Sequence, residues 1–581
     1  MRSILSRGIG VAVAMTLAVV VAAAPFGKAT IPTEISRMVP ADCYLLGYTG
    51  SIQDMQQDMV AAASAVEPQM AMMVAMGGPA TMLNMVVKKE GGGMGSGGVK
   101  IDGAAAMFMG PADPETGEPL SGVIFEVADA DGLVSAQPTM TLIRLPNTNW
   151  VCLANREYAL PSAASSLGDG MLDATISANF DQAKAIEEFK DQIDDVLAAM
   201  QQPMPEGVLP HEQMAMMQRG QAANVAKIKM FMDMISAWDI GIDLNGADLD
   251  VLMRMVPTDP SMVTKGTPEL KDLARLVPGD MPIVGVMNGD VLSMIMEMSK
   301  ADFEVMPPET RAKMEALMPV WTSCLSSLKT GVACGVSFGE KGLEVVSVMD
   351  TDDPEVALAA IEKGWTALCA ADIGVNAEPL QIFRGKGAGY LVTLDAKKMM
   401  AAFGMDSMMP PAAEGQPDPM ALMQGMLNDF MGDDGMPVRY LVEGNHIVNV
   451  VGSARLVSAR KLVNDGGADN TLSGLLGDPL ASPQWAAVVD VRETISGGLE
   501  FARAMMGPMG AMLPPTAPAG EPVLLTMVGS TDGTTWDQIR IQTNMKAWYA
   551  MIQEFEKAFN PPAKPAKPAK PVAEATPTGG V

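Results

Sequence analysis

The chain has 581 residues, and 40 lysines and arginines against 68 aspartates and glutamates give a net charge of −28. Sequence-independent nucleic-acid binding depends on basic surface, so this balance argues against a nucleic-acid partner. Hydrophobic residues make up 48% of the chain, which excludes wholesale disorder. The 2 histidines exclude most histidine-rich metal sites, whereas the 53 methionines are an unusual excess.

The N-terminus has the pattern of a secretory signal peptide. Two arginines precede an apolar run from Ile9 to Ala24, and small residues follow it. Cleavage after Ala24 or after Ala29 is expected, so residues 1–29 are predicted to be the signal peptide. The predicted location is extracytoplasmic, either periplasmic or secreted. An uncleaved N-terminal anchor is the alternative, and we expect no stable transmembrane span after cleavage.

The 5 cysteines have no CxxC spacing and therefore match no metal knuckle. An odd number leaves at least one of them unpaired. Outside the cytosol a disulfide is permitted, and Cys324 and Cys334 are the closest pair in the sequence. The sequence is equally consistent with cysteines that are buried free thiols.

Two pairs of segments indicate an internal repeat. Residues 37–47 match residues 275–285 with coinciding Arg, Pro, Asp and Gly, and residues 149–154 match residues 445–450. A weaker third match relates one hairpin late in the first half, with an Asn-Gly turn, to one hairpin late in the second half, with an Asp-Gly turn. The spacing between the first two matches is longer in the second half, largely through a methionine-rich insert at about 399–436.

These matches predict two copies of one domain, residues 30–267 and residues 268–560. Residues 561–581 repeat Pro, Ala and Lys and are predicted to be a disordered, solvated tail.

The hydrophobic periods within each copy are mixed. An apolar stripe with a 3.6-residue period predicts a helix at 180–200, and further helices are expected at 354–368 and 545–559. Residues 335–346 read as a hairpin. Hairpins separated by helices, without strict βαβ alternation, predict an α+β class: two tandem domains, each an antiparallel sheet with helices packed on one face.

One motif resembles that of a serine hydrolase. Residues 335–339 match G-x-S-x-G around Ser337, and Asp352 and His446 follow in the chain order used by that fold. The motif requires a strand before the serine and a helix after it. Here a second strand is expected after it, so a catalytic triad is disfavoured.

Two further patterns are read as structural. Residues 93–98 satisfy G-x-G-x-x-G, but a helix is expected before them and a strand after them, the reverse of a dinucleotide site. Several acidic clusters, including those at 129–131 and 350–353, lack the twelfth-position Glu of a calcium loop. Turns explain most of them, and a specific calcium site is the minor alternative.

The methionines allow three interpretations. Clusters occur at 70–76, 214–217, 399–409 and 420–431. Thioethers suit Cu(I), so a copper-handling segment is one hypothesis. A methionine-rich surface for a partner is the second, and adaptable packing on helices is the third. The enrichment along the whole chain favours packing.

The strand entry Val39-Pro40-Ala41-Asp42, repeated as Val277-Pro278-Gly279-Asp280, resembles a loose family of secreted bacterial proteins of unknown function, the DUF3352 type. The resemblance implies an extracytoplasmic, non-enzymatic protein with duplicated α+β domains. It supplies no functional residues.

The leading hypothesis is a secreted or periplasmic binding or structural protein, whose sheets and crevice offer a surface for an apolar ligand or a protein partner. A hydrolase using carboxylates or a serine nucleophile is the first alternative, and a methionine-based copper-handling protein is the second. No catalytic, cofactor-binding or metal-binding residue is assigned, and no cofactor is expected.

Overall fold

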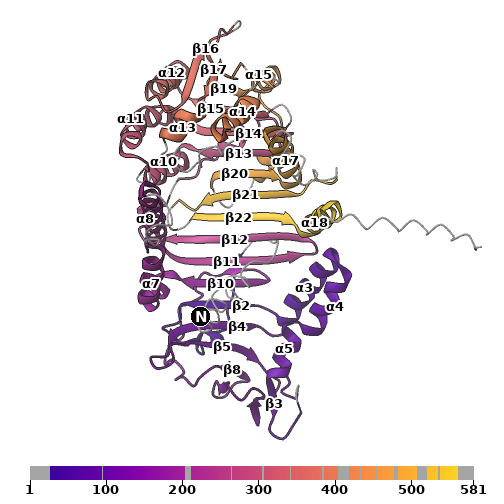
Figure 1. Ribbon diagram of the computed structural model, residues 1–581. Helices are drawn as coiled ribbons and strands as arrows, with labels where there is room; N and C mark the ends of the chain where they lie inside the picture. Colours follow the sequence, from indigo (N-terminus) through magenta and orange to yellow (C-terminus); the bar gives the residue numbers. More distant parts are fainter. Residues whose placement is uncertain are drawn as a thin grey trace, which may run out of the picture.

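The computed structural model describes residues 27–93, 96–202, 211–263, 265–303, 306–339, 342–382, 385–402, 418–431, 434–452, 455–476, 482–506, 520–533, 535 and 537–559. Most of the predicted signal peptide, part of the methionine-rich insert and the predicted tail lie outside the described residues. The described chain is organised around one continuous sheet of 18 strands, with helices along both of its sides (Figure 1).

Every neighbouring pair in the large sheet is antiparallel. From one edge to the other the strands are β16 (Val375–Pro379), β17 (Gly387–Leu394), β18 (Met436–Glu443), β19 (His446–Val451), β15 (Gly342–Thr351), β14 (Leu328–Gly339), β13 (Ile283–Asn288), β20 (Ser482–Asp490), β21 (Leu524–Thr531), β22 (Asp537–Asn544), β12 (Asp248–Pro257), β11 (Ile235–Asn245), β10 (Ile176–Asp181), β2 (Leu45–Thr49), β4 (Ala105–Ala112), β5 (Pro119–Glu126), β8 (Trp150–Ala154) and β7 (Thr141–Arg144). Two small sheets pair β1 (Gly27–Lys28) with β9 (Leu172–Asp173), and β3 (Val87–Lys89) with β6 (Leu133–Ser135).

The helices vary widely in length. They are α2 (Thr33–Ser36), α3 (Ile52–Val66), α4 (Pro68–Gly77), α5 (Pro79–Val86), α6 (Gln182–Glu188), α7 (Lys190–Met200), α8 (His211–Met234), the 3-10 helix η1 (Pro260–Met262), α9 (Leu270–Ala274), α10 (Gly289–Phe303), α11 (Pro308–Leu325), α12 (Pro354–Ala370), α13 (Ala396–Ala402), α14 (Pro419–Met431), α15 (Leu456–Asn464), α16 (Thr471–Leu475), α17 (Val491–Met506) and α18 (Met545–Phe559).

The α+β class with a large antiparallel sheet is confirmed. The helix predicted at 545–559 is α18, and the one predicted at 354–368 lies within α12. The helix predicted at 180–200 is two helices. Strand β10 continues to Asp181, whose side chain accepts a hydrogen bond from the backbone N–H of Lys184 at 3.0 Å, and the helix is interrupted at Phe189.

The two halves of the sheet have the same strand order. Counted outward from β12, the strands are β11, β10, β2, β4, β5, β8 and β7. Counted outward from β22, they are β21, β20, β13, β14, β15, β19 and β18. The segment between β15 and β18 adds β16 and β17 at one edge of the sheet.

The sheet has two faces, which we name by their residues. Face A carries Leu46, Val284 and Arg540, and face B carries Gly47, Gly285 and Ile541. On face A, each half of the sheet has its own core. Short helices α9, α15 and α16 cover one core, and α2 together with the segment after β8 covers the other.

Face B is covered by helices near both ends of the sheet. At one end, α3 and α5 pack on β4, β5 and β8 through Ile52 and Ala80. At the other end, α12 and α14 pack on β17 and β18 through Trp365 and Met431. Between these two caps, α3 and α18 also pack on β11 and β12 through Ala62 and Met545. The rest of the middle of face B forms the candidate site.

Candidate binding surface

The middle of face B is a continuous apolar surface, which we call the apolar floor. Its members come from strands β4, β10, β11, β12, β22, β21, β20 and β13: Met107, Ala178, Phe180, Trp238, Ile240, Val251, Met253, Met255, Ile539, Ile541, Leu525, Met527, Trp485, Ala487, Val489, Ile283 and Met287. Met107 is exposed and all the others are half-buried.

Strand register places these side chains together. Across the central strands, Ala487 is opposite Met527, Met527 is opposite Ile541, and Ile541 is opposite Val251. Directly opposed residues of neighbouring strands share a face and lie about 5 Å apart. The floor crosses nine neighbouring strands, β2 included, and strands lie about 4.8 Å apart, so it is roughly 40 Å long.

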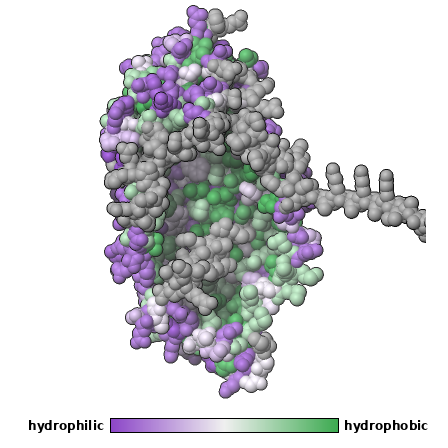
Figure 2. Space-filling view, viewed as in Figure 1, coloured by the Kyte–Doolittle hydropathy of each residue, from purple (hydrophilic) through white to green (hydrophobic). Residues whose placement is uncertain are grey.

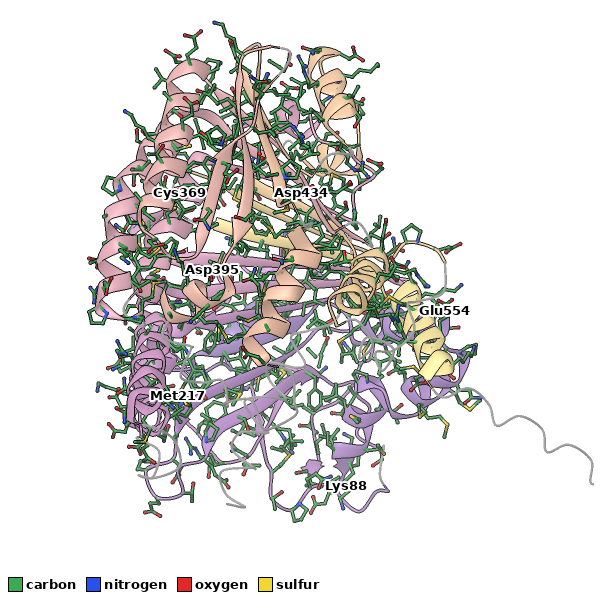
Figure 3. The ribbon with its side chains drawn as sticks, turned by 45° about the horizontal axis from the view of Figure 1, so that its top comes forward. Lys88, Met217, Cys369, Asp395, Asp434 and Glu554 are labelled. Carbon is green, nitrogen blue, oxygen red and sulfur yellow. The ribbon has the colours of Figure 1, made fainter. Side chains whose placement is uncertain are left out.

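Helices border the floor on both sides. One wall contains α7, α8, α10 and α11, and the other contains α5, α3, α18 and α17 (Figure 1). Both walls join the two halves of the chain, because α8 contacts α10 and α18 contacts α3. Figure 3 shows α8 with Met217 on one side of the molecule and α18 with Glu554 on the other. Figure 2 shows the hollow between the walls, with a largely hydrophobic visible surface.

Two tryptophans contribute to the floor. The indole N–H of Trp238 donates to Oε1 of Gln182 at 2.6 Å, and its ring lies against Phe231 with centroids 5.9 Å apart. Trp485 lies over Gly529, where an added Cβ would be 2.0 Å from the indole nitrogen. Gly529 therefore leaves the space that the Trp485 ring occupies.

Face A of the same central strands is polar. Asp250 is 1% exposed and accepts hydrogen bonds from Nε of Arg540 at 2.8 and 2.9 Å and from Nε2 of Gln542 at 2.6 Å. Asp239 accepts from Nδ2 of Asn179 at 2.7 Å and pairs with Arg254, and burial raises its pKa. These groups bind each other across β10, β11, β12 and β22, so they stabilise the centre of the sheet.

The apolar floor was not predicted from the sequence, although its residue pattern contains one signal for it. The signal was the alternation at 249–255, where Leu249, Val251, Met253 and Met255 face one way and Asp250, Leu252 and Arg254 the other. Such alternation indicates that a strand has one apolar and one polar face. It does not show which parts of either face the helices of the chain cover.

The residues of the hydrolase hypothesis are not assembled. Asp352, the acid of that hypothesis, is exposed between β15 and α12. Nε2 of His446 lies 3.7 Å from Oδ1 of a different residue, Asp350, whose other oxygen accepts from Thr330 at 2.5 Å. Ser337 lies six residues farther along β14 than the position beside Asp350, which is roughly 20 Å along a strand. Ser337 also lies within strand β14, and not at a turn from a strand to a helix.

The other motifs have structural roles where they are described. In the glycine motif, Ser96 Oγ accepts a hydrogen bond from the backbone N–H of Lys89 at 2.9 Å, in the loop between β3 and β4. Met94 and Gly95 of this motif lie outside the described residues. At the acidic cluster 129–131, Lys89 pairs with Asp129 at 2.7 Å. Among the described residues, no group of three or more His, Cys, Asp or Glu side chains could hold a metal ion.

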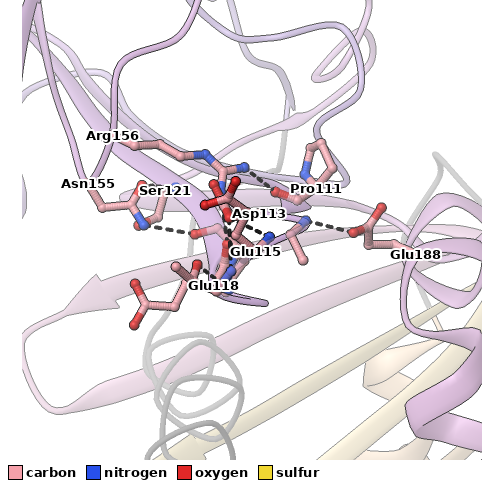
Figure 4. A network of polar contacts seen from close by, with 11 residues as sticks. Pro111, Asp113, Glu115, Glu118, Ser121, Asn155, Arg156 and Glu188 are labelled. Carbon is pink, nitrogen blue, oxygen red and sulfur yellow. Dashed lines mark hydrogen bonds and ion pairs between the residues drawn. The ribbon is translucent and has the colours of Figure 1, made fainter.

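A polar network beside β4 and β5 is structural as well (Figure 4). Arg156 donates to the carbonyls of Glu118 at 3.0 Å and Pro111 at 2.7 Å, and it pairs with Asp113 at 3.4 Å. Glu188, at the end of α6, accepts from the backbone N–H of Ala112 at 2.6 Å. The network fixes the β4–β5 turn against β8 and α6.

All five cysteines are free thiols. Cys43 and Cys152 are buried in the face A core, and burial raises the pKa of each to about 12. Cys334 lies on face B of β14 opposite Gly285, and burial raises its pKa to about 11. The disulfide between Cys324 and Cys334 that the sequence permitted is therefore not formed.

A pocket of about 460 Å³ lies apart from the floor, between α11 and α12. Apolar residues of the two helices line it together with Ser323 and Lys363. Such a lining does not supply an acid–base pair.

Comparison with known protein families, with curated proteins and with solved structures gives no match. Within the described residues, no helix has the length and apolar character needed to cross a bilayer.

Proposed function

We propose that the protein is an extracytoplasmic, non-enzymatic binding protein whose apolar floor takes a long-chain apolar ligand, such as the acyl chains of a lipid. One observation carries the proposal: among the described residues, the centre of the sheet is apolar on a face that helices border along its two sides, and it is polar on the other face. Solvated sheet faces are ordinarily polar, so an open apolar face marks a binding surface.

The dimensions agree with acyl chains. The hydrocarbon core of a bilayer is about 30 Å thick and contains two opposed layers of chains, so one chain spans about half of that. A floor roughly 40 Å long is longer than one such chain. Each buried methylene contributes about 0.8 kcal/mol to binding, so a flexible chain needs no specific polar contact.

Four strands of each half contribute residues to this surface. We propose that residues 30–267 and 268–560 are copies of one unit, supported by their matching strand order and by the sequence matches at their strand entries. Hairpins β11–β12 and β21–β22 pair at the junction, which joins two half-length surfaces into one floor.

The proposal is tested by titrating the mature protein with cis-parinaric acid, a polyene fatty acid that fluoresces in apolar surroundings. We expect saturable binding that unlabelled stearate displaces. Absence of saturable binding, or fluorescence that stearate does not displace, would refute the acyl-chain proposal.

A further inference from the structure

A second apolar surface lies outside the floor, on helices α4 and α5. From Pro68 to Val87 the chain has no charged residue, whereas 19% of all its residues are charged. Helix α4 has no buried residue. We call the exposed methionines of the two helices the methionine ridge: Met70, Met72, Met73, Met76, Met82 and Met85, which are 40–73% exposed.

The ridge is held in place by polar contacts to its neighbours. Gln56 of α3 accepts from the backbone N–H of Ala80 at 2.9 Å, which fixes the start of α5. Gly78 between the helices leaves no room for a Cβ, which would lie 2.6 Å from the carbonyl oxygen of Val74. At the other end of α4, Glu67 accepts a hydrogen bond from the Tyr549 hydroxyl of α18. Helix α4 lies on the outer side of one wall (Figure 1), and these contacts hold it and its exposed methionines at a fixed place.

We propose that the methionine ridge docks on the surface of a lipid bilayer. A protein interface normally has a polar rim that sets its orientation, but this stretch has no charge to form ion pairs. Flexible thioether side chains adapt to an irregular, fluid partner. At 10 residues α4 is too short to span a bilayer, so the proposed docking is at the bilayer surface.

The net charge of −28 decides the kind of bilayer. An anionic surface repels such a chain, whereas a zwitterionic surface does not. Docking by the uncharged ridge is therefore strongest on phosphatidylcholine and weaker on anionic lipid. Because screening weakens repulsion, added salt does not weaken the docking.

The proposed docking on a bilayer involves other residues than the proposed ligand binding does. The floor can bind an acyl chain without the ridge, and the ridge can dock without a ligand in the floor. A vesicle assay and a fatty-acid titration therefore fail independently.

The test is co-sedimentation of the full mature protein with phosphatidylcholine vesicles. We expect the M72S/M73S/M76S variant to bind at least ten-fold more weakly, because it removes the most exposed part of the ridge. The matched control, M217S/M262S/M294S, changes three methionines that are 38–45% exposed on α8, η1 and α10, and it should bind like the unmodified protein. Both variants should unfold at the same urea concentration as the unmodified protein, which reports a folded sheet independently of fatty-acid binding.

A second variant reports the contact itself. The indole of M73W should shift its emission to the blue on addition of these vesicles. The inference is overturned if the unmodified protein does not bind phosphatidylcholine, if it binds anionic vesicles only, or if the ridge and control variants bind equally. An unshifted M73W emission on bound vesicles would also overturn it.

Discussion

The two faces of strands β12 and β22 share one backbone and differ in chemistry. On face A, Asp250 and Arg540 bind each other; on face B, Val251 and Ile541 are opposed and half-exposed. A polar solvated face beside a covered apolar face is the ordinary arrangement of an antiparallel sheet. Here the hydrogen-bonded groups lie on the polar face, and among the described residues the apolar face is bordered by helices along its two sides, which is the basis of the proposed ligand surface.

The largest predicted effect is a difference in unfolding free energy between substitutions of two adjacent valines of β20. Val488 is in the face A core and is 6% exposed, whereas Val489 belongs to the floor. Val488→Asp buries an unpaired charge and should cost about 4 kcal/mol or more of unfolding free energy. Val489→Asp should cost about 1 kcal/mol, because its side chain is already partly hydrated. Urea unfolding measures both.

The same valine pair also separates stability from binding. Val489→Asp should weaken the binding of cis-parinaric acid at least ten-fold. If the two substitutions destabilise the protein equally, face B is an ordinary core and the comparison fails.

The second largest effect is a loss of stability expected from a substitution on the polar face. Asp250→Ala leaves the guanidinium of Arg540 without its carboxylate partner at the junction of the halves, and we expect a loss of about 3 kcal/mol. Binding of cis-parinaric acid should be retained in the folded variant. Lys461→Ala is the control, since its pair with Asp465 is 75% and 56% exposed and should contribute less than about 0.5 kcal/mol. Equal losses would show that the central polar network does not stabilise the sheet.

A smaller effect is expected from Gly529→Ala. The added methyl group meets the indole of Trp485, which must move into the hollow over the floor. We expect a shifted tryptophan emission and several-fold weaker fatty-acid binding. Gly425→Ala, where nothing lies within 4 Å of the new Cβ, is the control. Unchanged binding and emission would place Trp485 outside the ligand surface.

The smallest effect concerns thiol reactivity. The thiolate is the reactive form, and the pKa of Cys334 is raised to about 11, so its alkylation should accelerate about ten-fold per pH unit between neutral pH and that value. Stearate should slow this reaction, because Cys334 lies on face B of β14, the strand next to the apolar floor. Cys43 and Cys152 should stay unlabelled in the native protein, with or without stearate. Mass spectrometry of iodoacetamide-treated protein checks each site, and labelling of Cys43 before Cys334 would contradict the face assignment.

Local elements could be predicted from the sequence because their signals are short-range. The helix predicted at 545–559 is α18, and the hairpin predicted at 335–346 lies within β14 and β15. The break at Phe189 escaped the prediction, since the apolar stripe runs through it without interruption.

The single sheet and its open face depend on contacts between distant residues. Asp250 and Arg540 are 290 positions apart, and no local pattern indicates that β12 pairs with β22. The alternation along β12 shows two unlike faces, but the cover of each face is decided by helices elsewhere in the chain. The methionine cluster at 70–76 was visible in the sequence, whereas its exposure on α4 depends on packing against α3.

The most direct test of an acyl-chain floor uses 9,10-dibromostearate, whose bromine atoms quench tryptophan emission on contact. Trp238 and Trp485 lie on the floor, and Trp150 is buried in the face A core. We expect saturable quenching by dibromostearate, no quenching by stearate, and loss of most of the quenching in the W238F/W485F variant. Quenching that persists in that variant, or none in the unmodified protein, would contradict a ligand seated on face B.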